Sequence, residues 1–278
     1  MKKINRRSFL AAAGLTAAAL ALTACGGSAS STASSTASSA ASSEAASTSA
    51  AAELTTVEAG KLTMATNAAF PPYEMTTDAG EFEGIDIDTA KAIAEKLGLE
   101  LQIDDMDFDA ALLSVQQGKA DIVMAGVTVT DERKAVMDFS DSYATGIQSI
   151  IVPNDSDIAS PDDLAGKKIG TQRGTTGYIY CSDDFGDENV VAYDDGLTAV
   201  QALKNGQVDA VVIDNAPAQE FVAANPGLKV LDTSYAEEDY AIGMAKGSAL
   251  EDAVNKALEE LKADGTLQAI VDKYINAN

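Results

Sequence analysis

The chain has 278 residues, 19 basic and 43 acidic, and a formal net charge of −24. A surface this acidic repels polyanions, which excludes a protein that binds nucleic acid or grips an anionic membrane. The sequence has no histidine, which excludes a Ser-His-Asp or Cys-His triad and every metal site that needs an imidazole ligand. With two cysteines there is no disulfide framework, and we predict neither a cofactor nor a metal ion.

Residues 1–24 have the pattern of a signal peptide. Four basic residues precede an apolar run of about 14 residues, shorter than the ~20 that span a membrane. The residues before Cys25 resemble the processing box of bacterial lipoproteins, so we predict that Cys25 becomes a lipidated N-terminus. An ordinary signal peptide with a chance cysteine is the alternative. Arg6-Arg7 is also typical of a twin-arginine signal, and both export routes stay open.

The next segment, residues 25–52, is of low complexity. From Gly26 to Ala52, 24 of 27 residues are Ser, Thr or Ala, which offer no apolar surface for a core. We predict a flexible tether with an r.m.s. reach of roughly 30 Å. The folded body begins at residue 53 and is long enough for one large or two small domains.

Strands and helices alternate along the body. The apolar run 62–66 predicts a strand, and apolar residues at helical spacing between Asp86, an N-cap candidate, and Gly98 predict a helix. A strand over 99–103, a helix over 109–118 and a strand at 122–125 follow. The alternation predicts an α/β fold with largely parallel sheets.

A short segment, a helix end followed by a buried strand, occurs twice in the sequence. Residues 118–123 align with 206–211 at an offset of 88 residues, each a helix end followed by a buried strand. The repeat predicts two lobes with a ligand at the carboxyl ends of both sheets, and a chance match is the alternative. Apolar runs at 147–152 and 240–244 predict two crossings between the lobes. The resulting division is signal peptide 1–24, lipidated cysteine and tether 25–52, lobe 1 53–143 plus 240–278, and lobe 2 147–236.

Arg133 is the first candidate for binding an anion. It follows Thr128, at a strand end, and Thr130, which is placed to cap a helix. A cation in the first turn of a helix is disfavoured by a few tenths of a kcal/mol, which indicates a partner, and a carboxylate suits the guanidinium best. A surface arginine paired with Asp131 or Asp138 is the alternative.

A second candidate anion site is the segment from Gln172 to Gly177. Its glycines, with Thr175 and Thr176, can form a nest of backbone N–H groups, and a plain turn is the alternative. Asp214 ends an apolar strand and offers a carboxylate for a cation, or a cap for the next helix. An anion site facing a lone acid predicts a ligand that carries both charges, which describes a free amino acid.

Aromatic residues stand near the same strand ends. Phe70 and Tyr73 flank two prolines after the first strand, and Phe108 follows the second. They could form a wall around the side chain of the ligand. Ordinary core packing and a rigid proline turn are the alternatives.

Several motifs together resemble the polar amino acid-binding proteins of ATP-binding-cassette importers. They are Thr66–Tyr73, Gly84–Asp88, Met106–Phe108, Ala125–Arg133, Asp138–Ser140, Gly174–Gly177 and Asp209–Asp214. The resemblance covers residues 61–275. It implies an α/β, two-lobed periplasmic-binding-protein fold of type II, in which each lobe is a mostly parallel sheet flanked by helices and a two-strand hinge lets the lobes close.

The resemblance also implies roles for single residues. Arg133, Thr128 and the Thr176 amide would hold the carboxylate of the ligand. Asp214, the Gly126 carbonyl and Thr128 would hold its ammonium group, with Phe70 and Phe108 beside the side chain. Relatives for basic amino acids often carry Asp where this chain has Asn67, and Gln172 takes a second side-chain position. A neutral polar ligand is therefore expected, although the acidic net charge would attract cations.

The expected protein is a monomeric receptor that is not an enzyme. It would be lipid-anchored outside the cytoplasm, in a bacterium without an outer membrane, and would pass its ligand to a membrane permease. One alternative is an enzyme of dehydratase or lyase type on the same fold, with Glu74 or Asp214 as its acid. The other is a sensing module that presents an amino acid to a membrane receptor.

Overall fold

A computed structural model describes residues 54–275. The predicted signal peptide, Cys25 and the predicted tether lie outside these residues, so these features stay predictions. The described residues form one compact unit, which contains two larger sheets and one small one. No helix in the described part of the chain has the length and apolar character to cross a bilayer.

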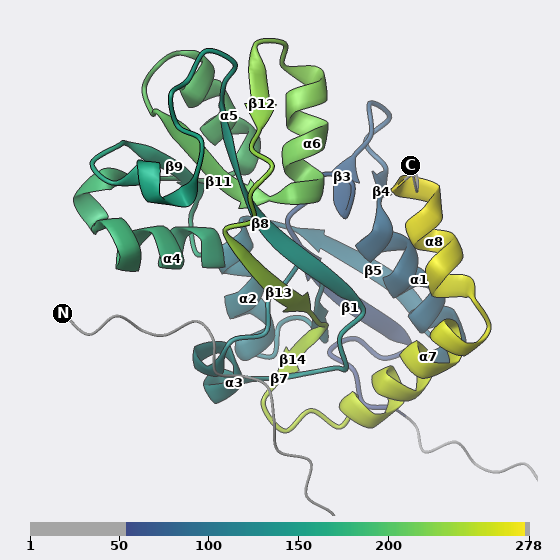
Figure 1. The fold of residues 1–278 in the computed structure, drawn as a ribbon. Helices are drawn as coiled ribbons and strands as arrows, with labels where there is room; N and C mark the ends of the chain where they lie inside the picture. The colour runs from purple at the N-terminus through teal and green to yellow at the C-terminus, as the bar shows by residue number, and fades with distance from the viewer. Residues whose placement is uncertain (1–53, 276–278) are drawn as a thin grey trace, which may run out of the picture. The chain divides into compact units, whose positions relative to one another are not determined.

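The first sheet has five strands in the order β5-β1-β6-β14-β7. Its strands are β1 (Lys61–Thr66), β5 (Glu100–Asp105), β6 (Ile122–Val123), β7 (Met137–Phe139) and β14 (Gly243–Ala245). Its helices are α1 (Ile85–Leu97), α2 (Phe108–Gln116), α3 (Asp131–Val136), α7 (Glu251–Ala263) and α8 (Thr266–Tyr274). We call this sheet and its helices lobe 1 (Figure 1).

The second sheet has the order β10-β9-β11-β8-β12, and β13 also pairs with β8. Its strands are β8 (Ala144–Pro153), β9 (Ile169–Gln172), β10 (Val190–Tyr193), β11 (Ala210–Asp214), β12 (Leu228–Val230) and β13 (Ala236–Tyr240). Its helices are α4 (Thr176–Phe185), α5 (Gly196–Lys204), α6 (Asn215–Ala224) and the 3-10 turns η1 (Pro161–Leu164) and η2 (Asp187–Asn189). This sheet and its helices form lobe 2.

Strand β1 shows why the first lobe is layered. Its side chains alternate between two faces, and both faces are buried. Leu62 and Met64 pack in the core that contains α1 and α7, while Ala65 packs with residues of α2. Helices therefore cover both faces of the sheet.

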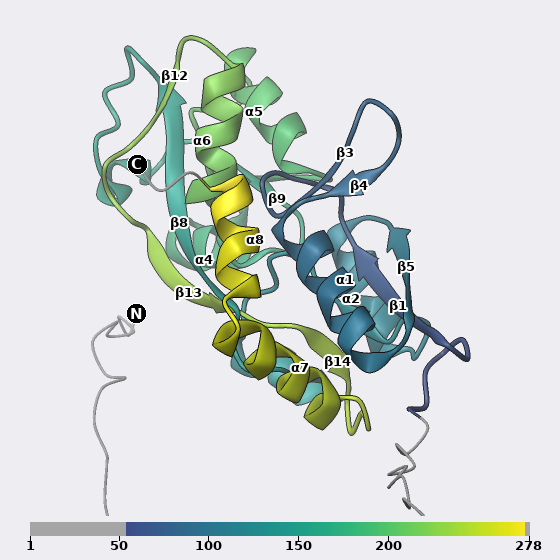
Figure 2. The same cartoon turned by 90° about the vertical axis from the view of Figure 1, so that its right-hand side faces the viewer.

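The C-terminal helices α7 and α8 pack on lobe 1. Figure 2 shows α7 and α8 beside α1. Lys273 binds the Asp88 carboxylate at 2.7 Å, and Lys96 binds Asp264 at 3.1 Å. Both ion pairs are largely exposed, so the packing of buried leucines such as Leu258 and Leu261 holds these helices in place.

Two segments connect the lobes. The chain leaves the first sheet at β7 and enters the second at β8, then returns from β13 to β14. Strands β8 and β13 pair antiparallel from Ala144↔Tyr240 to Gln148↔Ala236. In each sheet a single strand runs against all the others, β14 in the first and β8 in the second, so each sheet is mostly parallel, as predicted. Strands β8 and β14 are antiparallel to their neighbours because each is entered directly from a crossing between the lobes rather than through a βαβ unit.

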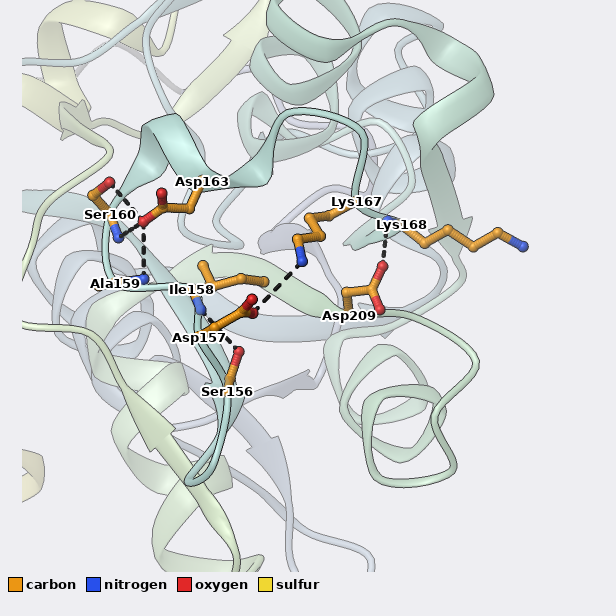
Figure 3. Close-up of polar contacts among 9 residues, drawn as sticks. All are labelled: Ser156, Asp157, Ile158, Ala159, Ser160, Asp163, Lys167, Lys168 and Asp209. Carbon is orange, nitrogen blue, oxygen red and sulfur yellow. Dashed lines mark hydrogen bonds and ion pairs between the residues drawn. The ribbon is translucent and has the colours of Figure 1, made fainter.

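The 88-residue repeat has a structural counterpart in both lobes. Gly118 and Gly206 adopt φ of 65° and 68°, the left-handed region that favours glycine. Three residues after Gly118, Asp121 accepts the N–H of Thr63 at 2.7 Å. Three residues after Gly206, Asp209 accepts the N–H of Lys168 at 2.8 Å, which Figure 3 shows. In each lobe the aspartate thereby fixes the start of a neighbouring strand.

The helix predicted to have Asp86 as its N-cap begins two residues earlier. Its N-cap is Gly84, whose φ of 134° suits glycine, and a Cβ there would lie 2.1 Å from the Tyr73 carbonyl oxygen. Asp86 lies inside the first turn and is fully buried. Its carboxylate accepts the N–H of Gly126 at 3.0 Å and the hydroxyl of Tyr143 at 2.8 Å, so this acid has a tertiary role rather than a capping one.

A third, small sheet was not predicted. It consists of β2 (Ala69–Phe70), β3 (Glu74–Thr76) and β4 (Phe82–Glu83) in sequence order. Strands of two or three residues are too short for an alternating pattern to appear. Its first hairpin pairs Phe70 with Glu74 and so turns both side chains to one face.

Candidate functional site

A cavity lies between the two lobes at the ends of several strands. The space within it and its mouth is about 310 Å³. Asn67 and Ala125 follow β1 and β6 of lobe 1, while Gln172 and Asp214 end β9 and β11 of lobe 2. The lining residues are Asn67, Phe70, Glu74, Phe108, Ala125, Gly126, Thr128, Gln172, Thr175, Thr176 and Asp214. This is the edge at which open α/β sheets bind small molecules.

Nine of the eleven predicted ligand-binding residues line this cavity, and two do not. Tyr73 lies behind Phe70, with ring centroids 5.9 Å apart, and packs edge-on against Tyr240 at 5.3 Å. It supports the wall of the cavity instead of forming it. Arg133 lies beside the lining residues Phe108 and Thr128.

Arg133 is buried, with 8% of its surface exposed. Its Nη1 donates to the Thr128 carbonyl at 2.7 Å and its Nη2 to the Gly174 carbonyl at 3.2 Å. The guanidinium carbon lies 5.4 Å from the centroid of the Phe108 ring. Burial lowers the pKa of Arg133, and the charge of Glu238 opposes that shift.

The surface ion pair considered for Arg133 does not form. Asp138 pairs with Lys246 at 2.6 Å, and within residues 54–275 no carboxylate lies within 4.0 Å of the Arg133 guanidinium. The helix position has the predicted cap, because Thr130 Oγ1 accepts the N–H of Arg133 at 3.2 Å. A buried cation held by carbonyl oxygens has capacity for an anion.

Asp214 supplies the opposite charge from lobe 2. It is 8% exposed, and its Oδ2 accepts from Gln148 Nε2 at 2.7 Å. Burial raises the pKa of Asp214 to about 7, and the nearby Glu238 carboxylate adds to the rise, while Tyr240 and Gln148 oppose it. A cation beside Asp214 would favour the ionised form.

Glu74 lines the cavity and was not among the predicted ligand-binding residues. It is fully buried, and no donor from the described residues bonds to either of its carboxyl oxygens. Burial and the neighbouring Asp86 carboxylate raise its pKa well above the usual value, and burial raises the pKa of Asp86 to about 6. The Phe70↔Glu74 pairing is the signal that could have found it, since an aromatic wall residue and its hairpin partner share one face.

The lobes touch directly around the cavity. Gln172 Nε2 donates to Asn67 Oδ1 at 2.8 Å, and the hydroxyls of Thr128 and Thr176 lie 3.4 Å apart. The Arg133 bond to Gly174 also joins the two lobes. At Gly174, which adopts φ of 76°, a Cβ would meet the Asp109 side chain of α2 at 3.2 Å.

The predicted anion nest has a helix behind it. Thr175 is the N-cap of α4, and its hydroxyl accepts the N–H of Tyr178 at 3.4 Å. The first N–H groups of a helix lack partners within the helix, and they attract anions. Thr176, the first residue of this ten-residue helix, lines the cavity.

The model for bacterial extracellular solute-binding proteins, family 3, matches residues 62–277. This chain is a family 3 solute-binding protein. The L-cystine-binding protein TcyJ of Escherichia coli K12 is 33% identical over 225 residues, which cover 80% of this chain and 85% of TcyJ. Membership of this family makes this chain a binding protein rather than an enzyme, and the dehydratase or lyase alternative is set aside.

Solved structures agree with this assignment. The arginine-, lysine-, histidine-binding protein ArtJ of Geobacillus stearothermophilus superposes with a TM-score of 0.75 at 34% identity, covering 78% of this solute-binding protein and 96% of ArtJ. An ancestral arginine-binding protein, solved with arginine, gives 0.74 at 44% identity and covers 78% and 99%. The same kind of ancestral protein was also solved with glutamine. The type II, two-lobed fold is confirmed.

Proposed function

We propose that this solute-binding protein captures a free amino acid between its two lobes and delivers it to an ATP-binding-cassette importer. The names of its relatives, which include cystine-, arginine- and glutamine-binding proteins, support this class of ligand. The observation that carries the proposal is the presence of two buried, opposite charges at one cavity: Asp214 lines it, and Arg133 lies beside its lining residues Phe108 and Thr128. Arg133 belongs to lobe 1 and Asp214 to lobe 2.

Arg133 and Asp214 would bind the two charged groups of the amino acid. The carboxylate would bind Arg133 and the N–H groups at the start of α4 near Thr176, since the Thr128 hydroxyl donates its hydrogen to Glu238. The ammonium would bind Asp214, the Gly126 carbonyl and Thr128. A ligand held by both lobes favours the closed arrangement, because each lobe alone provides only part of the site.

The remaining cavity residues determine which class of amino acid side chain the site would accept. Asn67 and Gln172 are neutral amides, and they support a neutral polar side chain such as an amide. Glu74 supports a second candidate, a cationic side chain, because a buried carboxyl without a donor would gain most from a ligand that brings N–H groups and positive charge. Phe70 and Phe108 would flank either side chain.

A thermal-shift screen over the twenty amino acids, cystine and ornithine tests the receptor proposal. A ligand at 100 times its dissociation constant adds ~2.7 kcal/mol to the stability, which a melting curve resolves. Stabilisation by at least one of these compounds is expected. No shift with any of them at millimolar concentration would contradict the proposal.

Calorimetry with arginine and glutamine at pH 8, in buffers of different ionisation enthalpy, separates the two side-chain classes. At this pH Asp214 is already ionised, since its pKa is about 7. If the ligand is cationic, Glu74 should release a proton on binding, because a nearby cation lowers a carboxyl pKa. The Glu74→Gln variant should abolish the release and weaken arginine binding by about 10- to 100-fold, leaving glutamine within about threefold. An equal loss of affinity for arginine and glutamine would show that Glu74 does not discriminate between a cationic and a neutral side chain.

We further propose that the protein works outside the cytoplasm, attached through a lipid on Cys25. The family of extracellular solute-binding proteins supports the location. The lipoprotein box and the Ser/Ala-rich segment 25–52 support the anchor. Metabolic labelling with a fatty acid tests it: wild type should incorporate label and the Cys25→Ser variant should not.

A further inference from the structure

Glu238 joins the two lobes but does not line the cavity. It lies on β13, one of the two strands that connect the lobes, and is only 6% exposed. Its Oε2 accepts the hydroxyl of Thr128 at 3.1 Å, the hydroxyl of Thr176 at 3.0 Å and the amide Nε2 of Gln148 at 3.0 Å. One carboxylate oxygen thus gathers donors from lobe 1, lobe 2 and the connecting strand β8.

Arg133 and Tyr180 both interact with the Glu238 carboxylate. The buried Arg133 guanidinium lies near enough for the charge of Glu238 to oppose the fall of the Arg133 pKa. The hydroxyl of Tyr180, on α4, also interacts with Glu238, and together with burial this raises the pKa of Tyr180. Hydrogen bonds to an ionised acceptor are roughly twice as strong as neutral ones.

The donors meet only when the lobes are closed. Thr128 follows β6 of lobe 1, whereas Thr176 opens α4 of lobe 2. Opening the cleft must take at least one of these hydroxyls away from Glu238, because the two belong to different lobes. The contacts therefore stabilise the closed arrangement relative to the open one.

The same contacts reach the proposed ligand groups. Gln148 Nε2 also donates to Asp214 at 2.7 Å, so one amide links Glu238 to the acid proposed to bind the ammonium. Thr128 and Thr176 line the cavity while their hydroxyls face Glu238. Glu238 is thus placed behind the site and acts on it through other residues.

We propose that Glu238 is a positioning residue that latches the two lobes together and so sets the affinity for every ligand without contacting any of them. The proposal rests on the proposed amino acid-binding function for its effect on affinity. Its effect on lobe closure needs no ligand. An apparent dissociation constant scales inversely with the fraction of closed, binding-competent protein, so loss of the latch should weaken all ligands by one common factor.

The test compares Glu238→Ala and Glu238→Gln with a matched control, Glu237→Gln. Glu237 is the neighbouring glutamate on β13, and its side chain is exposed. Small-angle X-ray scattering of the full chain without ligand measures the radius of gyration. Calorimetry measures the dissociation constants of the two best ligands from the screen. Melting curves check that each variant folds, and Glu238→Gln, which keeps the shape and one acceptor oxygen, serves if the alanine variant does not.

Glu238→Ala should have a larger radius of gyration than wild type without ligand, and the wild-type value when ligand is saturating. Both dissociation constants should rise by about tenfold, with their ratio unchanged within about threefold. Glu238→Gln should lie between Glu238→Ala and wild type, and Glu237→Gln should match wild type. An unchanged radius of gyration would overturn the latch, and a changed ratio would show that Glu238 contacts the ligand. If neither wild type nor variants bind amino acids, a larger radius in Glu238→Ala would still support the latch while the proposed function fails.

Discussion

Replacing Arg133 with methionine should weaken amino acid binding by about 2 to 5 kcal/mol, the cost of leaving a buried charge without its partner. The ligand carboxylate would enter a cavity that has lost its nearest cation and keeps Asp214 and Glu74. Calorimetric titration with the preferred ligand measures the loss. Methionine keeps an unbranched apolar side chain beside Phe108, so the change removes charge and hydrogen bonds more than volume.

The matched control is Arg173→Met. Arg173 is 53% exposed at its side chain and pairs with Asp194 at 3.6 Å on the surface of lobe 2. Both variants remove one positive charge, but the Arg173 side chain is exposed and does not line the cavity, whereas Arg133 is buried beside it. Equal affinities for wild type and Arg133→Met within about 0.5 kcal/mol, or an equal loss in both variants, would refute the role of Arg133.

Asp214→Asn should lower affinity and raise stability in the same protein. Asparagine keeps the shape of the side chain but cannot pair with an ammonium group as an anion, so binding should weaken by about 2 to 5 kcal/mol. Without ligand, the variant no longer buries a carboxylate, and we expect it to be more stable at pH 8 by roughly 1 to 3 kcal/mol. Urea unfolding without ligand and calorimetry with ligand measure the two effects.

The pH dependence of Asp214 has a definite sign. Its pKa rises from 3.8 in the unfolded chain to about 7 in the folded one, so the folded state holds this proton more tightly. The contribution of Asp214 to stability without ligand should therefore fall as pH rises from about 4 to about 7 and level off above, while the raised pKa of Glu74 continues the fall. Asp86, whose folded pKa is about 6, adds a fall in the same direction. Several polar and charged groups interact with Asp214 by hydrogen bonds or electrostatically: Gln148, Tyr240, Glu238, Tyr73 and Glu74.

Affinity should follow the opposite course. Below about pH 7 Asp214 takes up a proton and loses its attraction for the ammonium, so affinity should fall by up to about tenfold per pH unit. Asp214→Asn should lack this dependence and show a flatter stability profile. An Asp214→Asn protein that is less stable than wild type at pH 8, or that binds as well, would contradict the role of the acid.

Strand ends were the most predictable part of the site. Asp214 was located from the apolar run that precedes it, because an α/β sheet brings the carboxyl ends of its strands to one edge, whereas the side-chain positions of Asn67 and Gln172 came from the family resemblance. Arg133 was singled out by its poor position on the helix dipole, and it proved to be buried without an acidic partner in the described chain. In these cases local sequence carries the physical signal.

Some residues owe their burial or their contacts to parts of the chain that are distant in sequence, and their places could not be predicted in the same way. Glu238 stands in an acidic stretch that reads as a solvated surface, and only the pairing of β13 with β8, about 90 residues earlier, buries it. Tyr73 was assigned to the cavity and Glu74 was not, because the two-residue strand β2 gives no alternation to read. Asp86 had the composition of a helix cap, but its tertiary bonds to Gly126 and Tyr143 decided its place.

The most direct measurement is a calorimetric comparison of the preferred amino acid with two analogues, one without the α-carboxylate and one without the α-ammonium group. If a buried cation and a buried acid hold the two ends of the ligand, each analogue should bind about 100-fold more weakly or worse, because a buried charge would be left unpaired. Either analogue binding within about threefold of the parent amino acid would contradict the two-charge site.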